Sequence, residues 1–382
     1  MNLCATRTGT TRAAATKTNL LSECASRHRP WKSCSSRQGR QRENQVVECR
    51  PSPKALKRGN RERTLHHHHH CSGPPHATTQ QQLFHCGSAL APLLDIRTHI
   101  LLVSQPIPEH TASVLGLPYP TSYVPGLTLS GYSDKMSISE RFFNLFFQMA
   151  GYYLSFEVYD SLTLIMRKHF GSNYPDIRQI IKDSPLILVN ADEFVDFPRP
   201  LFPNIIYIGG IGMNEKKDEE SNKLDDQLNF VMNKGKKGVV LFSFGTSMST
   251  NDLPKIFIKN LFKTFKKFSD YHFIVKVDIT DNFIKELATD IKNIFTINWI
   301  PQTKILSHPR LKLFITHCGY NSLLEAGMAG IPVLLMPFFF DQFRNARVAE
   351  RNGWGLYFDK KLLLKSNDEF KLALQTILVN ER

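Results

Sequence analysis

The stretch from Trp299 to Gln342 constrains the fold of this chain more than any other. An apolar run at Leu313–Ile315 ends in Thr316-His317-Cys318-Gly319, and a second apolar run at Ile331–Met336 follows a segment with helical spacing. The order strand, tight turn, helix and strand is typical of an open α/β sheet. Ligands of such sheets bind at the carboxyl ends of the strands, where the polar residues of this stretch gather.

The residues of the turn suggest an anion site. Asn321 and Ser322 can open a helix, and a helix N-terminus offers unpaired N–H groups and a positive dipole end to an anion. His317 lies one turn earlier and can add a hydrogen bond or a charge. Because Asn321 and Glu325 are four residues apart, they share one helix face, and Glu325 is placed where a carboxylate could accept ribose hydroxyl protons.

Strands and helices alternate regularly in the second half of the chain, which predicts an α/β fold with a parallel sheet. We expect strands at 239–244, 272–277, 294–297, 313–315, 331–336 and 356–358, and helices at 253–268, at about 321–329 and from about 367. Upstream, short strands are expected at 99–104, 186–190 and 205–208.

A long helix is predicted to begin after Ser137, because Ser137-Ile-Ser-Glu140 resembles a capping box. Its first turns carry Phe142, Phe143, Phe146, Phe147 and Tyr153. The favoured interpretation of these aromatic side chains is core packing, and the alternative is a helix that lies on a membrane surface.

The positive charge of the chain belongs to one end. The formal net charge of the 382 residues is +14, and residues 1–65 hold 15 Lys and Arg against four Glu. This end is rich in Arg, Ser, Thr, Gln and His and has few residues that could form a core, so we expect residues 1–96 to be disordered. No aromatic interleaving or known module accompanies the charge, so no specific nucleic-acid partner is expected.

Cysteine and histidine patterns do not predict a metal or disulfide framework. Six of the seven cysteines lie in residues 1–86 without Cys-x-x-Cys spacing, and Cys318 is expected to be a buried small residue. The run His66–His70 could bind metal, but we favour a low-complexity segment. No apolar stretch long enough to span a membrane and no secretory leader are recognised in this chain.

Several familiar sites are excluded by spacing. There is no phosphate-binding Walker loop, no His-Glu-x-x-His, and no Asp-x-Asp pair for a divalent ion under a diphosphate. A nucleotide diphosphate would therefore be bound by protein donors alone. Trp299 could stack on a base or belong to the core, Gln302 could pair with the base edge, and Asp341 with Gln342 could hold sugar hydroxyls, although Gln342 could also be a solvated side chain.

Residues 299–342 closely resemble the donor-binding motif of UDP-glycosyltransferases. The match comprises Trp299-x-x-Gln302, His317-x-Gly319-x-Asn321-Ser322-x-x-Glu325, Pro332, Pro337 and Asp341-Gln342. Phe242–Thr246 resembles the preceding phosphate loop of the family, and Ser122–Gly126 with Gly209–Ile211 resemble its animal branch, which includes UDP-glucuronosyltransferases.

The resemblance implies a GT-B fold of two Rossmann-like domains and an inverting, metal-independent transfer of a hexosyl group, glucuronosyl or glucosyl, from a UDP-sugar to a small lipophilic acceptor. It implies no cofactor. By resemblance Trp299 and Gln302 hold uracil, Glu325 the ribose, and Asp341 and Gln342 the sugar. The residues implied at the phosphates are Thr246, His317, Asn321 and Ser322, Gly319 is implied as a further donor-binding residue, and Lys276 matches a basic position in the strand before.

The family's catalytic His and its Asp partner are not matched in this chain. Residues 1–96 do not resemble the family, residues 97–212 resemble part of an acceptor domain, 213–226 read as a linker, and 227–382 as a donor domain truncated at its end. The alternative function is therefore a catalytically inactive fragment that binds UDP-sugar. Family resemblance also implies detoxification at the endoplasmic reticulum membrane, and leaves self-association or pairing with a homologue open.

Overall fold

The computed structural model describes residues 86–94, 96, 98–127, 131–211, 224–246, 248–278 and 280–379. The chain divides into a unit Met1–Ser72 and a unit Gly73–Arg382, and every described residue belongs to the second. The run His66–His70, most of the predicted linker, and Cys4, Cys24, Cys34, Cys49 and Cys71 lie outside the described residues.

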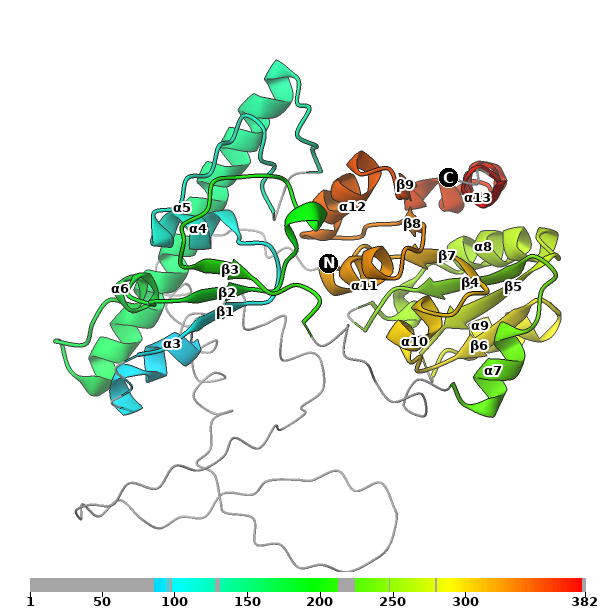
Figure 1. Cartoon of the computed structure of the whole chain (residues 1–382), viewed down its shortest axis with the longest axis horizontal. Helices are drawn as coiled ribbons and strands as arrows, with labels where there is room; N and C mark the ends of the chain where they lie inside the picture. Colours follow the sequence, from blue (N-terminus) through cyan, green and yellow to red (C-terminus); the bar gives the residue numbers. More distant parts are fainter. Residues whose placement is uncertain are drawn as a thin grey trace, which may run out of the picture. The chain divides into compact units, whose positions relative to one another are not determined.

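Six parallel strands form the larger sheet (Figure 1). They are β4 (Gly238–Ser243), β5 (Tyr271–Lys276), β6 (Ile294–Ile297), β7 (Leu311–Thr316), β8 (Val333–Leu335) and β9 (Gly355–Tyr357). Their order is β6-β5-β4-β7-β8-β9. The chain thus leaves β4 in one direction, returns to its other side at β7 and continues outward, which is the doubly wound arrangement of a Rossmann fold.

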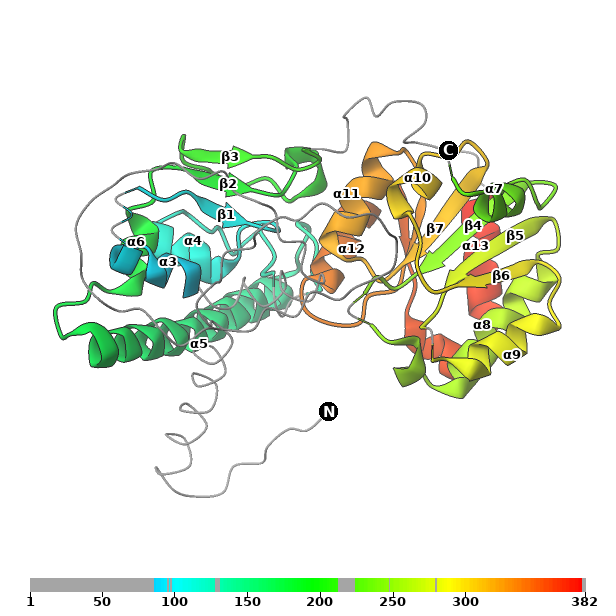
Figure 2. The same ribbon diagram turned by 90° about the horizontal axis from the view of Figure 1, so that it is seen from below.

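Helices cover both faces of this sheet (Figure 2). On one face lie α8 (Lys255–Lys267), α9 (Asn282–Thr289) and α13 (Asp368–Val379). On the other lie α7 (Asp226–Met232), α10 (Gln302–Leu306), α11 (Tyr320–Met328) and α12 (Gln342–Arg351). Successive residues of β4 enter opposite cores, with Val240 and Phe242 facing α8 and Val239 and Leu241 facing α11. Burial on both faces explains the unbroken apolar runs in the sequence.

A smaller parallel sheet precedes it in the chain, in the order β1 (Leu101–Val103), β2 (Ile187–Val189), β3 (Ile205–Tyr207). Its core includes residues of α3 (Cys86–Leu90), α4 (Glu109–Leu115), α5 (Ile138–Phe170) and α6 (Ile177–Lys182). Tyr320 and Leu324 of α11 also belong to this core, so α11 contacts both sheets. Every strand expected from the sequence is present, with each bound within two residues of the expected one.

Helix α5 confirms one expectation and corrects another. Ser137 caps it through a capping box with Glu140, as the sequence predicts. The aromatic side chains of its first turns are not core: Phe142, Phe143, Phe146 and Tyr153 are exposed, while Asn144 and Gln148 on the opposite side are buried. The polar side chains face inward because they donate hydrogen bonds to the loop carbonyls of Thr121 and Val124. Buried carbonyls need hydrogen-bond donors, which an apolar side chain cannot provide.

The described residues contain no helix with the length and apolarity needed to cross a membrane. Helix α5 is long enough, with 33 residues, but it is not apolar enough to cross a membrane.

Regular structure begins earlier than the sequence predicts. Residues 86–94 form α3 and a 3-10 turn at Pro92–Leu94, although the stretch to residue 96 is expected to lack structure. Ala89 is buried against the core of the smaller sheet, and the Tyr174 hydroxyl donates to its carbonyl. Small residues of this kind carry little local signal, so their packing is decided by distant partners.

Helix α8 offers a matched test of the core. Ile258 is 1 % exposed and Ile256 is 47 % exposed on the same helix. Ile258→Ala should lower the free energy of unfolding by about 2–5 kcal/mol, because it leaves a cavity in a packed core. Ile256→Ala should change it by less than about 1 kcal/mol. Urea unfolding of both variants measures the difference, and equal losses would contradict this placement of α8.

Candidate donor-binding site

The order of the strands brings two loops together. β4 and β7 are neighbours in the larger sheet, and their last residues, Ser243 and Thr316, are paired in register. The chain leaves β4 toward β5 and β7 toward β8, so the topological switch point of the sheet lies between them. Open α/β sheets bind ligands at this point, beyond the carboxyl ends of the strands.

His317 fills the space between these two loops. A Cβ atom added to Gly245 would lie 2.7 Å from its Cε1, and one added to Gly319 would lie 2.6 Å from its Nε2. The imidazole therefore packs against two glycines, and only residues without a side chain fit there. Gly245 also has a φ of 70°, a left-handed conformation that other residues rarely adopt. Among the described residues the buried Nδ1 of His317 has no hydrogen-bond partner.

At this turn the positive charge is carried by Lys276, whereas His317 is neutral. Burial, with a contribution from Lys276, lowers the pKa of His317 to about 4, so the imidazole is neutral at pH 7. Of the two roles open to His317 in the sequence, this environment favours a hydrogen bond over a charge. Lys276 ends β5, and its Nζ donates to the carbonyl of Gly245. Burial lowers the Lys276 pKa from 10.5, and Asp278 opposes that shift.

A second group of predicted residues meets one turn along α11. The side-chain amide of Gln302 donates to Ser322 Oγ at 3.1 Å and to Glu325 Oε2 at 2.5 Å. Burial raises the pKa of the Glu325 carboxyl, and the hydrogen bond from Gln302 opposes that shift. Trp299 is 63 % exposed, so it is not the core residue that the alternative interpretation allowed. Its indole is available for stacking.

The N-terminus of α11 lies between these two groups. Gly319 is its N-cap and makes no side-chain cap, so the first N–H groups of the helix are not bonded by the capping residue. The exposed Asn321 accepts a hydrogen bond at 2.8 Å from Asn190, which follows β2. Thr246, predicted at the phosphates, is exposed beside Gly245 in the loop after β4.

The two residues predicted for the sugar stand at the start of α12. Asp341 is the N-cap position, and burial raises the pKa of its carboxyl. Gln342 is buried and its Oε1 accepts from the N–H groups of Phe338 and Phe339, so it is not a solvated side chain. Its side-chain carbonyl oxygen thereby holds the loop that precedes α12.

Sequence reasoning missed residues that hold this arrangement. Asp278, after β5, accepts hydrogen bonds from the Ser249 hydroxyl and the Thr250 N–H and fastens the loop that follows Gly245. Asn345 donates both to Asp341 and to the carbonyl of Cys318. The available signals were an acidic residue at the carboxyl end of a strand and an Asp-to-Asn spacing of four on one helix face.

Cys318 is structural, as expected. It is fully buried with a free thiol, and burial raises its pKa well above the usual range. Its φ of 69° turns the chain from β7 into α11. In the described part of the chain no group of three or more His, Cys, Asp or Glu side chains is arranged to hold a metal ion.

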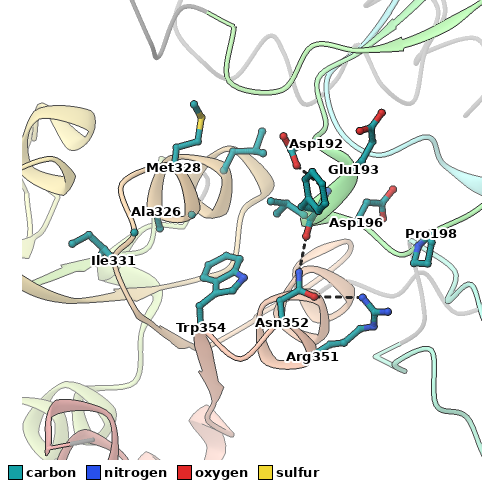
Figure 3. Close-up of a pocket in the computed structure, with 15 residues that line it drawn as sticks. Asp192, Glu193, Asp196, Pro198, Ala326, Met328, Ile331, Arg351, Asn352 and Trp354 are labelled. Carbon is teal, nitrogen blue, oxygen red and sulfur yellow. Dashed lines mark hydrogen bonds between the residues drawn. The ribbon is translucent and has the colours of Figure 1, made fainter. Parts of the chain in front are cut away.

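A separate cavity of about 850 Å³ contains none of the ten predicted donor residues. It lies at the other end of α11, where Met328, Ile331 and Trp354 face the segment Asp192–Pro198 (Figure 3). The chemistry suggested by the sequence gathers at the β4–β7 switch point, so we place the candidate site there.

Comparisons with known proteins agree with the fold and motif. The family model described as UDP-glucoronosyl and UDP-glucosyl transferase matches residues 72–382. The chain belongs to this family. The match begins before residue 97, where the motif resemblance starts, so it includes part of the stretch expected to be unrelated.

The curated relatives of this chain include worm proteins. The chain is 39 % identical over 302 residues to ugt-48 of Caenorhabditis elegans, a UDP-glucuronosyltransferase by name, which covers 78 % of this chain and 56 % of the relative. It is 37 % identical to ugt-47 of the same organism, over 78 % of this chain and 55 % of the relative. The chain thus spans about half the length of the curated relatives it matches.

A solved structure supports the fold. The glycotransferase of kitacinnamycin matches with a TM-score of 0.52 at 19 % identity, over 80 % of this chain and 74 % of that chain. At this identity the likeness concerns the fold alone, and it confirms the α/β fold of GT-B type that the sequence motif implies.

A substitution at Gly319 tests the packing of His317 against this glycine. A Cβ at Gly319 would displace the imidazole, so Gly319→Ala should weaken UDP binding by about tenfold or more and lower the melting temperature. Gly327→Ala, on the same helix, meets only Trp354 at 3.9 Å and should be neutral or slightly stabilising. Calorimetric UDP titration with thermal unfolding compares the two, and equal behaviour would contradict this packing of His317.

The low pKa of His317 predicts a pH dependence of stability. The unfolded chain protonates this residue below its ordinary pKa of 6.5 and the folded chain only below about 4, so unfolding takes up a proton between these values. The contribution of His317 to the free energy of unfolding should be fully present above pH 6.5. It should fall as pH decreases below that value, by at most about 1.4 kcal/mol per pH unit for one group.

Urea unfolding between about pH 4.5 and 7 measures this slope. His317→Gln should reduce it without removing it, because burial and the charge of Lys234 also lower the pKa of His272 to about 4. An unchanged slope in His317→Gln would show that His317 titrates normally.

Proposed function

We propose that this chain binds a UDP-sugar at the β4–β7 switch point and transfers its hexosyl group, glucuronosyl or glucosyl, to a small lipophilic acceptor. One observation carries the proposal. The neutral His317 with Lys276 precedes the uncapped N-terminus of α11, and the hydrogen-bonded group of Gln302, Ser322 and Glu325 is built on the first two turns of that helix. This spacing suits a diphosphate at one end and a nucleoside at the other.

The nucleoside end is proposed to work through stacking and hydrogen bonds. The exposed indole of Trp299 provides a flat apolar face for uracil, and Gln302 is placed to pair with the edge of the base. Glu325 is the acceptor for ribose hydroxyls. Its raised pKa reflects a carboxylate that loses hydration by burial, and two hydroxyl donors would offset that loss.

The diphosphate is proposed to be held by protein donors without a divalent ion. The N–H groups of α11, the hydroxyls of Thr246 and Ser322, and Asn321 donate hydrogen bonds, and the Lys276 ammonium supplies the positive charge. A phosphate oxygen at His317 would also satisfy a ring nitrogen that otherwise has no partner among the described residues. As the sugar leaves UDP, negative charge grows on the diphosphate, so these donors would stabilise the transition state more than the bound donor.

The transfer itself is proposed to invert the anomeric carbon. The acceptor oxygen attacks that carbon from the side opposite UDP while a general base takes its proton. Asp341 and Gln342 would orient the sugar through its hydroxyls. No residue of this chain is assigned as the base. His99 lies just before β1, and its Nε2 is hydrogen-bonded to Ser184 Oγ at 2.8 Å. Neither His99 nor His110 matches the context of the family's catalytic histidine.

This missing assignment favours one alternative, a catalytically inactive fragment that retains UDP-sugar. By family resemblance alone, the proposal further includes detoxification at the endoplasmic reticulum membrane and association with itself or a homologue.

Titration with UDP tests the donor site. UDP should quench the fluorescence of the full chain, and Trp299→Phe should remove the quench and weaken binding by about 1–3 kcal/mol, the range for stacking of one base. Trp354→Phe is the matched control, because Trp354 lines the separate cavity, and it should retain both. Absence of UDP binding by the unmodified chain would contradict both the enzyme and the fragment.

A transfer assay then separates the two functions. UDP-glucose and UDP-glucuronate are each incubated with a small phenol and the full chain, with and without EDTA. Turnover that EDTA leaves unchanged is the result expected for a metal-independent transferase, and UDP binding without turnover selects the inactive fragment.

A further inference from the structure

Arg344 is a fully buried charged residue three positions after Asp341. Its Nη2 lies 2.6 Å from Asp196 Oδ1, and the two side chains are 1 % and 2 % exposed. Asp196 belongs to the segment that follows β2, whereas Arg344 lies on α12 beside the larger sheet. A buried ion pair requires close geometry and further hydrogen bonds to offset the lost hydration of both charges.

The same guanidinium makes two further contacts with the part of the chain that forms the smaller sheet. Its Nε donates to the carbonyl of Pro125 at 3.1 Å, and its Cζ lies 5.0 Å from the ring centre of Phe197. The Pro125 carbonyl also accepts from the Tyr119 hydroxyl at 2.9 Å. Asn144 accepts from the next N–H, that of Gly126, so Arg344 meets a loop that is itself held in place.

Other residues of α12 contact the same part of the chain. Arg347 donates to the carbonyl of Gly131 and Arg351 pairs with Asp134. Arg344, Arg347 and Arg351 have the spacing of one helix face. Asn352, after the last turn, donates to the carbonyl of Phe194 at 2.6 Å (Figure 3). These outer contacts are partly exposed and contribute less than the buried pair.

The first turn of α12 is hydrogen-bonded to the turn that precedes α11. Asn345, adjacent to Arg344, donates to Asp341 at 2.7 Å and to the carbonyl of Cys318 at 3.1 Å. Gln342 accepts from two N–H groups of the preceding loop. The positions of Asp341 and Gln342 therefore depend on how this turn is held, and Arg344 is the member of the turn that joins it to Asp196 and Pro125.

We propose that Arg344 is a positioning residue for the sugar end of the donor site. By holding the first turn of α12 against Asp196 and Pro125, it sets where Asp341 and Gln342 meet the hexose. This inference rests on the proposed function and adds a residue that the donor motif does not include. Gln302, Ser322 and Glu325 of the nucleotide end lie on α10 and α11, and none of the three Arg344 side-chain contacts given above reaches these helices, so its loss should affect the sugar more than UDP.

The test compares two ligands on the full chain. Isothermal titration gives the Kd for UDP and for the UDP-hexose that the unmodified chain binds, UDP-glucose or UDP-glucuronate. Arg344→Lys keeps the charge but loses the planar fork that reaches both Asp196 and Pro125. It should raise the Kd for the UDP-hexose by about tenfold or more and that for UDP by less than about twofold, because small displacements of positioned groups have large effects.

Arg347→Lys is the matched control, on the same face one turn away and partly exposed, and it should leave both constants within about twofold. The double variant Arg344→Met with Asp196→Leu replaces the pair by apolar groups, which usually preserves folding. It should show the same selective loss as Arg344→Lys.

Two results would overturn the inference alone: an unchanged UDP-hexose Kd in both Arg344 variants, or equal weakening of UDP and UDP-hexose in a chain whose near-ultraviolet circular dichroism is native. If the unmodified chain binds neither ligand, the proposed function fails and the inference fails with it. Hydrogen exchange gives a ligand-free readout, in which amides 341–345 should exchange at least about tenfold faster in Arg344→Lys than in Arg347→Lys.

Discussion

The packing of His317 against Gly245 and Gly319 is the contact on which the candidate site depends. It joins the loops after β4 and β7, which are adjacent in the sheet but 72 positions apart in the chain. Because the imidazole occupies the space that two side chains would need, the two loops can approach each other closely. The same burial keeps the imidazole neutral, and it leaves the ammonium of Lys276 as the cation beside Gly245.

Strain and burial at this junction have a local cause. Cys318 adopts a left-handed backbone, and the chain turns there from β7 directly into α11, whose N-cap Gly319 makes no side-chain cap. A wider turn with a side-chain cap would satisfy the first N–H groups of α11 internally and remove them from a ligand. The Asn345 contacts to the Cys318 carbonyl and to Asp341 then connect this turn with the start of α12.

Contacts between the two sheet segments converge on helices α11 and α12. Tyr320 and Leu324 join the core of the smaller sheet, and the buried Arg344–Asp196 pair connects α12 to the segment after β2. These helices also carry Asn321, Glu325, Asp341 and Gln342. Residues proposed to bind the donor thus share their helices with residues that contact the other part of the chain.

The sequence by itself predicted every strand of the two sheets, helices α5, α8, α11 and α13, and a candidate site within residues 299–342. Apolar strands with small-residue loops, the Ser137 capping box and the 299–342 motif have local physical causes, because periodicity, capping and turn chemistry act over a few residues. The approach of His317 to Gly245 could be anticipated only as far as both follow parallel strands.

Only the tertiary structure decided which side chains are buried and with whom they pair. It places the aromatic residues of α5 at the surface and Asn144 inside, exposes Trp299, buries Gln342 and joins Arg344 to Asp196, 148 positions earlier in the chain. The reason is that desolvation depends on every atom packed around a group, and those atoms come from segments far apart in sequence. A neutral His317 follows from the same cause, because no local pattern specifies how completely water is excluded.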